Sequence, residues 1–269
     1  MSLTWFVVAR NLLSRWLVRR ERTEAHSTNT QYLVQLSGYL WVAGRFGRLD
    51  GLRVLDVACG EGFGAGLLGK RGAKVWAVDL DLSVLRLARS RYGRPAVRFV
   101  AMDAARLALA SERFDLVISQ DTLEHVQDDT RFVGELHRIL GPGGNLVVMT
   151  PAASVHTTAP QNPFHLREYS VESLRELLAP YFPEVQLFGR RPTLMLAQME
   201  LAMNRVRRFD PFGVRRWLIP SAFRHRVGSW LCRQHGLPAL STAHAGLVEY
   251  FEGTEGSGTL IVWCRKERS

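Results

Sequence analysis

Short apolar runs alternate with helical segments along this chain, and that alternation limits the fold more than any other feature. Runs rich in β-branched and aromatic residues predict strands at 53–57, 74–79, 97–103, 114–120 and 145–150. Helical segments are predicted between them, at 62–70, 83–91 and 129–140. Strands that are apolar throughout and alternate with helices form a parallel sheet covered on both faces. The sequence therefore predicts an α/β fold with a doubly wound sheet.

The elements around this core divide the chain into three parts. Amphipathic helices are predicted at 3–18 and 30–46, so residues 1–48 form an N-terminal helical part. The sheet domain takes residues 49–191 plus 247–266, with a helix that opens at Ser170, a strand near 184–189 and a last strand at Thr259–Cys264. Residues 192–246 are predicted to form an Arg-rich helical insertion before that last strand.

Two helix starts carry capping signals. We assign Ser83 and Asp129 as N-caps of the second and third helices of the sheet domain. A side-chain oxygen at that position accepts a hydrogen bond from a backbone N–H of the first turn.

A glycine-rich turn follows the first strand, where residues 54–64 are VLDVACGEGFG. Glycines let the backbone approach a ligand closely, and open α/β sheets bind nucleotides at the carboxyl ends of their strands. A tight strand-to-helix turn without a ligand is the alternative interpretation. Gly60, Gly62 and Ala65 also fit the G-x-G-x-x-A pattern of dinucleotide-binding folds.

Acidic residues end the next two predicted strands. The carboxylate of Asp79 can accept hydrogen bonds from both hydroxyls of a ribose, and that of Asp103 can accept one from an adenine amine. Residues 139–144, ILGPGG, end a helix just before the fifth strand, because proline and glycine stop a helix and turn the chain.

This ordered set of motifs resembles the class I S-adenosylmethionine-dependent methyltransferases, over about residues 50–190 and the last strand. The resemblance implies a Rossmann-like, seven-stranded sheet with an antiparallel last strand. It implies S-adenosylmethionine as the cofactor, with its methionine part at the glycine-rich loop, its ribose at the second strand and its adenine at the third. The residues that it assigns to the cofactor are Asp56, Ala58, Cys59, Gly60, Gly62, Asp79, Leu80, Asp103, Ala104, Ser119 and Gln120. The family often has glycine where this chain has Ala58.

The acceptor side resembles bacterial type 11-like methyltransferases of glycan, lipid and secondary-metabolite pathways, on residues 162–170. His125 and His165 are the candidate general bases, since imidazole titrates near neutral pH; a structural role stays open for both. Asp121, Glu124 and His125 also resemble the magnesium site of ubiquinone-pathway O-methyltransferases. That site is an open alternative, and no residue is assigned as a metal ligand.

The net charge of +10 is unevenly placed. Residues 1–24 carry +3 and residues 190–236 carry +8, so the remainder is close to neutral. The arginines form either a solvated face or a surface for an anionic acceptor or an anionic membrane. The apolar face of 3–18 suits a bilayer interface or packs on the sheet domain. No RNA-binding module is recognisable, so no nucleic-acid partner is expected.

Cysteine usage and hydropathy indicate the compartment. Cys59, Cys232 and Cys264 form no CxxC pair, which favours a reducing cytoplasm over a disulfide framework. No apolar stretch approaches the roughly 20 residues that span a bilayer, and Arg10 interrupts the first one. We expect a cytoplasmic protein, with peripheral contact at the inner membrane surface left open.

The sequence as a whole predicts an S-adenosylmethionine-dependent methyltransferase. We expect O-methylation of a sugar, a glycan precursor or another small molecule, with a lipid-linked or anionic acceptor among the candidates. An NAD(P)-dependent oxidoreductase and a non-catalytic, membrane-associated cofactor-binding protein are the alternatives.

Overall fold

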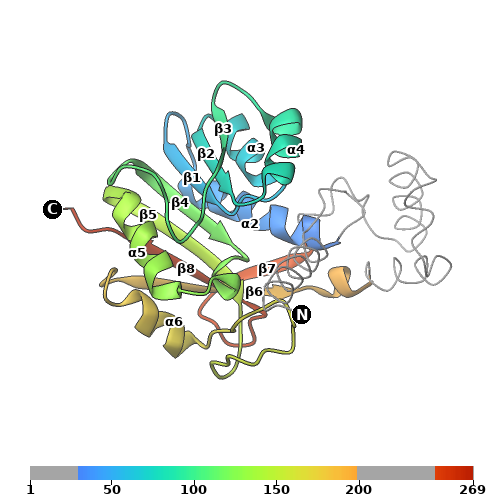
Figure 1. The fold of residues 1–269 in the computed structure, drawn as a ribbon. Coiled ribbons are helices and arrows are strands. Elements are labelled where there is room, and N and C mark those ends of the chain that lie inside the picture. Colours follow the sequence, from blue (N-terminus) through green and yellow to red (C-terminus); the bar gives the residue numbers. More distant parts are fainter. Residues whose placement is uncertain (1–29, 199–245, 269) are drawn as a thin grey trace, which may run out of the picture.

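The computed structural model describes residues 30–198 and 246–268 (Figure 1). Within them one sheet runs in the order β3-β2-β1-β4-β5-β8-β6-β7. Its strands are β1 (Arg53–Val57), β2 (Lys74–Asp79), β3 (Val97–Ala101), β4 (Phe114–Gln120), β5 (Leu140–Pro151), β6 (Val185–Pro192), β7 (Val248–Glu252) and β8 (Thr259–Arg265). The first five are parallel, and β8 is antiparallel to both of its neighbours. The predicted α/β sheet with an antiparallel last strand is confirmed.

Helices cover both faces of this sheet. The helices α2 (Thr30–Phe46), α3 (Phe63–Lys70) and α4 (Leu82–Tyr92) lie on one face, and α5 (Asp129–Ile139) and α6 (Val171–Leu178) lie on the other (Figure 1). In β1, Val54 belongs to the hydrophobic cluster of the first face and Leu55 to that of the second. Because side chains alternate along a strand, burial on both faces requires an unbroken apolar run.

The sheet has eight strands among the described residues, whereas seven were predicted. The additional strand is β7, which pairs antiparallel to β6 at the edge of the sheet. Residues 248–252, VEYFE, mix acidic and aromatic residues and are only half-buried, so they carry no apolar run. A strand at the edge of a sheet that is covered on one face only does not need an unbroken apolar run.

Two strand boundaries also differ from the prediction. β3 ends at Ala101, so Asp103 follows the strand instead of ending it. β5 begins at Leu140 and includes the glycines that were expected to form a turn. Gly143 has a positive φ of 73°, and Leu140 pairs with Phe114 of β4. The segment 140–144 therefore extends the strand, with an irregular register, instead of separating helix from strand.

The helix caps lie slightly earlier than predicted. The N-cap of α4 is Asp81, whose carboxylate accepts from the backbone N–H of Ser83 at 2.8 Å. The N-cap of α5 is Asp128, which accepts from the backbone N–H of Arg131 at 2.9 Å. The assignments of Ser83 and Asp129 were wrong because each lies inside its helix, after an aspartate that takes the capping role. Ser170 caps α6, where a helix start was predicted.

Several predicted segments lie outside the described residues. These are the helix at 3–18 and most of the Arg-rich insertion, of which residues 194–198 are described and helical. Within residues 30–198 and 246–268, no helix combines the length and apolarity needed to cross a membrane.

Candidate functional site

The loop after β1 has the backbone of a ligand-approach turn. Ala58, Gly60 and Gly62 all have positive φ angles, of 58°, 53° and 78°. A Cβ built on Gly60 would meet no atom within 4 Å, so the outer surface of the loop is open there. A Cβ on Gly62 would approach Phe99 to 2.5 Å, which is too close. Position 62 therefore requires glycine, because a larger residue would overlap Phe99. At position 60, glycine leaves the backbone accessible from outside the loop.

Asp79 connects this loop to the end of β2. One carboxylate oxygen accepts from the backbone N–H of Gly60 at 2.9 Å, and the other accepts from that of Asp81 at 2.9 Å. The residue is 8% exposed. A carboxylate has about four acceptor positions, so it can accept from backbone N–H groups and from hydroxyls at the same time. The acid predicted to hold a ribose thus also fixes the glycine-rich loop.

Asp56 lies beneath the same loop. It is fully buried, and the hydroxyl of Tyr39, on α2, donates to its Oδ1 at 2.8 Å. Burial raises the pKa of Asp56 to about 7, although the Tyr39 hydroxyl and the backbone N–H of Ala65 counteract that rise. Asp56 therefore supports the loop from inside the core.

The other predicted cofactor residues lie at the carboxyl ends of β1 to β4. Leu80 is 75% exposed and directly follows Asp79. Asp103 is exposed and accepts from the backbone N–H of Ala105, while Ala104 is half-buried. Cys59 is buried within the loop. Parallel strands end at one edge of a sheet, so these residues share that edge.

Helix α2 packs over the end of β4, a contact that the sequence did not indicate. The side-chain amide of Gln35 donates to Oδ2 of Asp121 at 2.8 Å, and Gln120 donates to the backbone oxygen of Gln35 at 3.3 Å. Asp121 has a φ of +50°, and Ser119, one of the predicted cofactor residues, is fully buried. A Cβ on Gly38 would approach Gln120 to 2.5 Å, so glycine permits this packing. Gln35 is a further candidate site residue, and only its tertiary contact identifies it.

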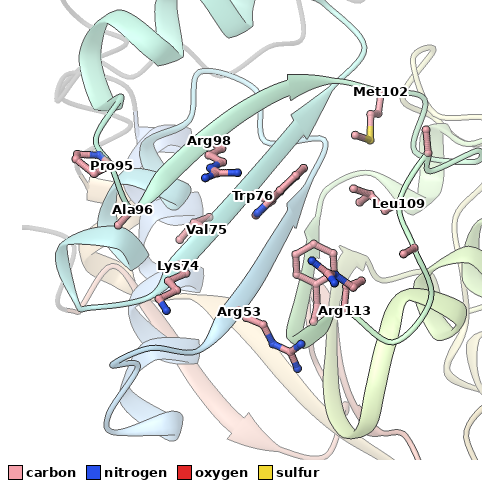
Figure 2. A pocket seen from close by; sticks show the side chains of 13 residues that line it. Arg53, Lys74, Val75, Trp76, Pro95, Ala96, Arg98, Met102, Leu109 and Arg113 are labelled. Carbon is pink, nitrogen blue, oxygen red and sulfur yellow. The ribbon is translucent and has the colours of Figure 1, made fainter.

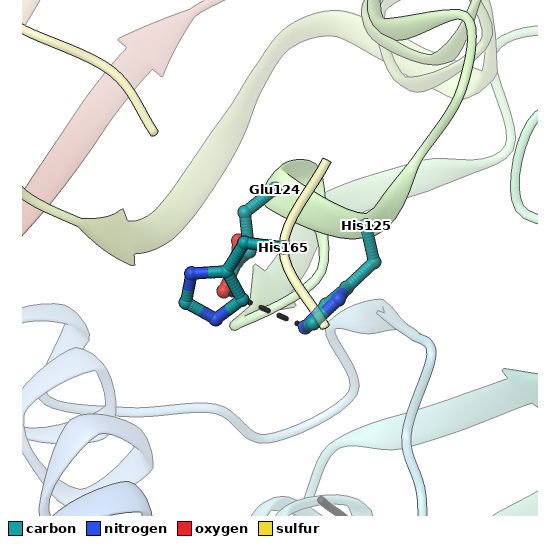
Figure 3. A group of neighbouring side chains, drawn as sticks. All are labelled: Glu124, His125 and His165. Carbon is teal, nitrogen blue, oxygen red and sulfur yellow. Dashed lines mark ion pairs between the residues drawn. The ribbon is translucent and has the colours of Figure 1, made fainter. Parts of the chain in front are cut away.

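Glu124, His125 and His165 come together beside this edge (Figure 3). One potential ligand atom from each residue lies within 4.8 Å of the others. The two imidazole rings are 5.1 Å apart, edge to face. Glu124 is 1% exposed and accepts from the Thr150 hydroxyl at 2.9 Å. The two histidines predicted as candidate bases are therefore neighbours, although they are 40 positions apart in the sequence.

Hydrogen bonds fix the orientation of both imidazoles. Nδ1 of His125 lies 2.9 Å from the backbone oxygen of Phe164. Since a carbonyl oxygen can only accept, that nitrogen carries the proton, and Nε2 is the basic nitrogen of neutral His125. In His165, Nδ1 lies 2.8 Å from Oε1 of Glu168 and Nε2 lies 2.8 Å from the side-chain amide of Asn162. His165 therefore bonds through both nitrogens within its own loop.

The predicted metal group differs from the group that the structure assembles. Asp121 is bonded to Gln35, and His165 lies beside Glu124 and His125 instead. Two imidazoles and one carboxylate suit a transition metal better than magnesium, which prefers oxygen ligands.

The loop at 162–169 is attached to α5. Arg167 forms an ion pair with Asp129, and the Tyr169 hydroxyl donates to Oδ2 of Asp129 at 2.7 Å. Arg167 also donates to the backbone oxygen of Gln127 at 2.8 Å. Asp129, predicted as a helix cap, instead holds this loop against the sheet edge.

A hollow of about 970 Å³ lies elsewhere, at the amino ends of β1 to β4 (Figure 2). Its charged lining residues are the cations Arg53, Lys74, Arg98 and Arg113. The guanidinium of Arg98 lies 5.6 Å from the centre of the Trp76 ring. Residues 102–113 form no helix, so this face of β2 and β3 is left uncovered. The hollow is separate from the predicted cofactor residues.

Comparison with known proteins shows which family this part of the sequence resembles. Residues 55–148 match the family described as "Methyltransferase domain". Over this segment the chain is similar to S-adenosylmethionine-dependent methyltransferases. The matched segment begins in β1 and ends in β5, so it includes the glycine-rich loop, Asp79 and the Glu124–His125 pair.

Curated bacterial proteins resemble this chain over part of its length. A protein of Mycolicibacterium smegmatis, named "Probable S-adenosylmethionine-dependent methyltransferase", is 37% identical over 134 residues, which is 49% of this chain and 51% of that one. A ubiquinone biosynthesis O-methyltransferase of Leptothrix cholodnii is 35% identical over 116 residues, which is 41% of this chain and 48% of that one. The chain thus spans about half the length of the curated relatives it matches.

Solved structures share the fold of the methyltransferase domain. A SAM-dependent methyltransferase from Thermotoga maritima has a TM-score of 0.60 at 18% identity, covering 96% of this chain and 99% of that one. The [4+2]-cyclase SpnF has a TM-score of 0.59 at 21% identity, covering 87% of this chain and 82% of that one. At these identities the likeness shows the fold alone.

Proposed function

We propose that this protein is an enzyme that transfers a methyl group from S-adenosylmethionine to an oxygen atom of a small-molecule acceptor. The observation that carries the proposal is the glycine-rich loop with Asp79 bonded to the backbone of Gly60. It lies inside the segment that matches the methyltransferase family. S-adenosylmethionine supplies the reactive methyl group, and the residues of this chain bind it, orient the acceptor and accept a proton.

The residues at the sheet edge fit this cofactor. The open surface at Gly60 admits a ligand against the backbone, and a carboxylate of the kind at Asp79 accepts from ribose hydroxyls as well as from backbone N–H groups. The exposed carboxylate of Asp103 suits an adenine amine, and exposed Leu80 gives an apolar surface between them. Asp56 acts from below, by holding the loop through Tyr39 and Ala65.

Two histidines serve the acceptor in different ways. His125 is the general base, because the Phe164 carbonyl fixes the proton on Nδ1 and makes Nε2, which lies 3.9 Å from Oε1 of Glu124, the basic nitrogen that accepts the proton of an acceptor hydroxyl. His165 is a positioning residue, because it bonds Glu168 and Asn162 and lies against the His125 ring. A divalent metal bound by Glu124, His125 and His165 is the alternative use of the same group, and magnesium is the less suitable ion.

Further features of the proposal concern the acceptor and its location. We place the acceptor among sugars, glycan precursors and lipid-linked or anionic small molecules, reached from the cytoplasm, with the inner membrane surface as a contact. The ubiquinone biosynthesis relative supports oxygen as the methylated atom. The segregated charge of residues 1–24 and 190–236 supports an anionic partner. The division into 1–48, 49–191 plus 247–266, and 192–246 stays a prediction.

Calorimetry tests the cofactor, and a labelling screen tests the reaction. S-adenosylmethionine should bind the full chain more tightly than NADH, and the reverse order would favour an oxidoreductase. Extract fractions incubated with methyl-labelled S-adenosylmethionine should then yield a labelled product, which mass spectrometry identifies. Binding without any methyl transfer would favour a non-catalytic cofactor-binding protein, a role that this fold also permits.

A further inference from the structure

Arg190 is a buried cation whose hydrogen-bond acceptors are neutral. It lies in β6 and is 6% exposed. Its guanidinium donates to the backbone oxygen of Val34 at 3.3 Å and to the hydroxyl of Thr259 at 3.1 Å. Among residues 30–198 and 246–268, no carboxylate forms an ion pair with it.

Several other arginines of the described residues form ion pairs with carboxylates. Arg167 pairs with Asp129, Arg138 with Glu135, and Arg53 with Asp115. Arg191, the next residue along β6, is exposed and pairs with Glu249 at 2.9 Å. Burying a charge without a countercharge is costly, so it persists where something compensates for it. Arg190 differs from these arginines, because it is buried and the acceptors of its guanidinium hydrogen bonds are the neutral groups of Val34 and Thr259.

The position of Arg190 is the edge where the proposed acceptor site lies. Val34, which accepts from Arg190, precedes Gln35, whose amide bonds Asp121 at the end of β4. Thr259 pairs with Pro151 at the carboxyl end of β5. In Figure 1, β6 and β7 meet α2 at this edge.

Tyr250 supports this placement. Its hydroxyl lies 2.7 Å from that of Ser37, on α2. Burial raises the pKa of Tyr250, an effect that Arg190 opposes and Asp121 reinforces. The phenol therefore lies within electrostatic reach of both charged groups.

Resting on the proposed function, we propose that Arg190 recognises an oxyanion of the acceptor, a phosphate or a carboxylate. Its planar fork presents five donors, more than Val34, Thr259 and Tyr250 take up, and that geometry matches such oxyanions. The bound oxyanion supplies a countercharge that no carboxylate of residues 30–198 and 246–268 supplies through an ion pair. Arg190 is then a specificity residue, because a neutral acceptor leaves the buried charge uncompensated.

A thermal-unfolding series tests the inference on the full chain. Wild type, Arg190→Met and Arg191→Met are heated in sodium phosphate and in sodium chloride of equal ionic strength. Phosphate should raise the Tm of wild type and Arg191→Met by about 3–5 °C over chloride once it exceeds its Kd tenfold. Arg190→Met should lose that increment. In chloride it should melt no lower than wild type, since a buried charge without an ion-pair partner among the described residues is removed and Ser37 still donates to Val34.

Other results of this series would overturn the inference. If phosphate stabilises all three proteins equally, or none of them, the inference is overturned. If Arg190→Met melts far below wild type in chloride, the arginine stabilises the fold through its contacts with Val34 and Thr259, and the inference fails. Should that variant not fold, Arg190→Lys replaces it, and an unweakened phosphate response in Arg190→Lys counts against fork recognition. Calorimetry with S-adenosylmethionine separates the proposals: binding by wild type with no Arg190-dependent phosphate effect leaves the proposed function standing.

Discussion

At the scale of single residues, Asp79 holds the loop at Gly60, and we propose that it also holds the ribose of the cofactor. Asp79→Ala should reduce S-adenosylmethionine affinity on the order of tenfold or more, since charge-assisted hydrogen bonds contribute about 1.5–3 kcal/mol. Calorimetry on the folded variant measures this. Asp50→Ala, which removes an exposed carboxylate paired with Arg48, is the control and should bind normally. Unchanged affinity in Asp79→Ala would remove the ribose assignment.

The two neighbouring histidines should respond differently to substitution. His125→Ala should lower kcat by about 10²–10⁴-fold, the usual contribution of a general base, with cofactor affinity nearly unchanged. His165→Ala should reduce kcat less and raise the KM of the acceptor, because it loosens the loop at Glu168 and Asn162. His156→Ala, at an exposed position, is the control.

Two results would contradict these roles. Turnover within a few-fold of wild type in both variants would mean that positioning alone drives the transfer. Activity lost with EDTA and restored by a divalent metal would assign Glu124, His125 and His165 to metal binding instead.

Asp56 should make the stability of the ligand-free protein depend on pH. Burial raises its pKa from 3.8 to about 7, so between pH 4 and 7 the native state holds a proton that the unfolded state has released. Stability therefore falls as pH rises through that window. The Asp56→Asn variant lacks this dependence. Its free energy of unfolding minus that of wild type should therefore increase by about 2–3 kcal/mol between pH 5 and pH 8. Urea unfolding at both values measures the difference, and an equal difference at both would refute the assignment.

At the scale of elements, the glycine-rich loop allows a matched comparison of two glycines. Gly60→Ala and Gly62→Ala both place a Cβ at positive φ, which costs roughly 1–2 kcal/mol. Gly62→Ala should lower the free energy of unfolding by about 1–3 kcal/mol more than Gly60→Ala does, because its Cβ overlaps Phe99 and Ala88. Ala58→Gly should stabilise the loop, since Ala58 already has a positive φ. Chemical unfolding of ligand-free proteins measures all three, and equal losses at 60 and 62 would contradict the packing argument.

The same elements show what the sequence could predict. Strands β1, β2 and β4 match the prediction at both ends, because burial on both faces leaves an apolar run that polar residues end. Strand β7 was missed, since an edge strand covered on one face tolerates Glu249 and Glu252. The N-caps of α4 and α5 were misplaced because capping-type residues cluster there, and only backbone geometry selects Asp81 and Asp128.

The candidate site was predictable to a similar degree. Asp79 and Gly60 carry local signals, a strand end and a glycine at a turn, and a hydrogen bond joins them in the structure. Gln35 and Arg190 carry none, because their significance comes from contacts with Asp121 and Val34, respectively 86 and 156 positions away. Tertiary contacts of this kind have no periodicity or motif in the sequence.

At the scale of the whole molecule, charge is segregated from the sheet domain. Residues 1–24 and 190–236 together carry +11, slightly more than the net charge of +10 of the whole chain. Of the ten arginines in the second range, Arg190 is buried and Arg191 pairs with Glu249, while the others lie outside the described residues. Such segregation has a physical use if these ranges face an anionic membrane, where each basic residue contributes about 1 kcal/mol near the surface.

Co-sedimentation with lipid vesicles tests this use. The protein should bind vesicles that contain phosphatidylglycerol at low salt, release as salt screens the charges, and ignore pure phosphatidylcholine. Removing residues 1–20 deletes four arginines and no acid, together with the apolar face of Trp5 and Trp16, and should weaken binding at least tenfold. The matched control removes four exposed arginines of the sheet domain by changing each to glutamine, at Arg86, Arg94, Arg106 and Arg175. Equal loss in both variants would show that binding follows net charge alone, and no vesicle binding at low salt would leave the arginines as a solvated surface.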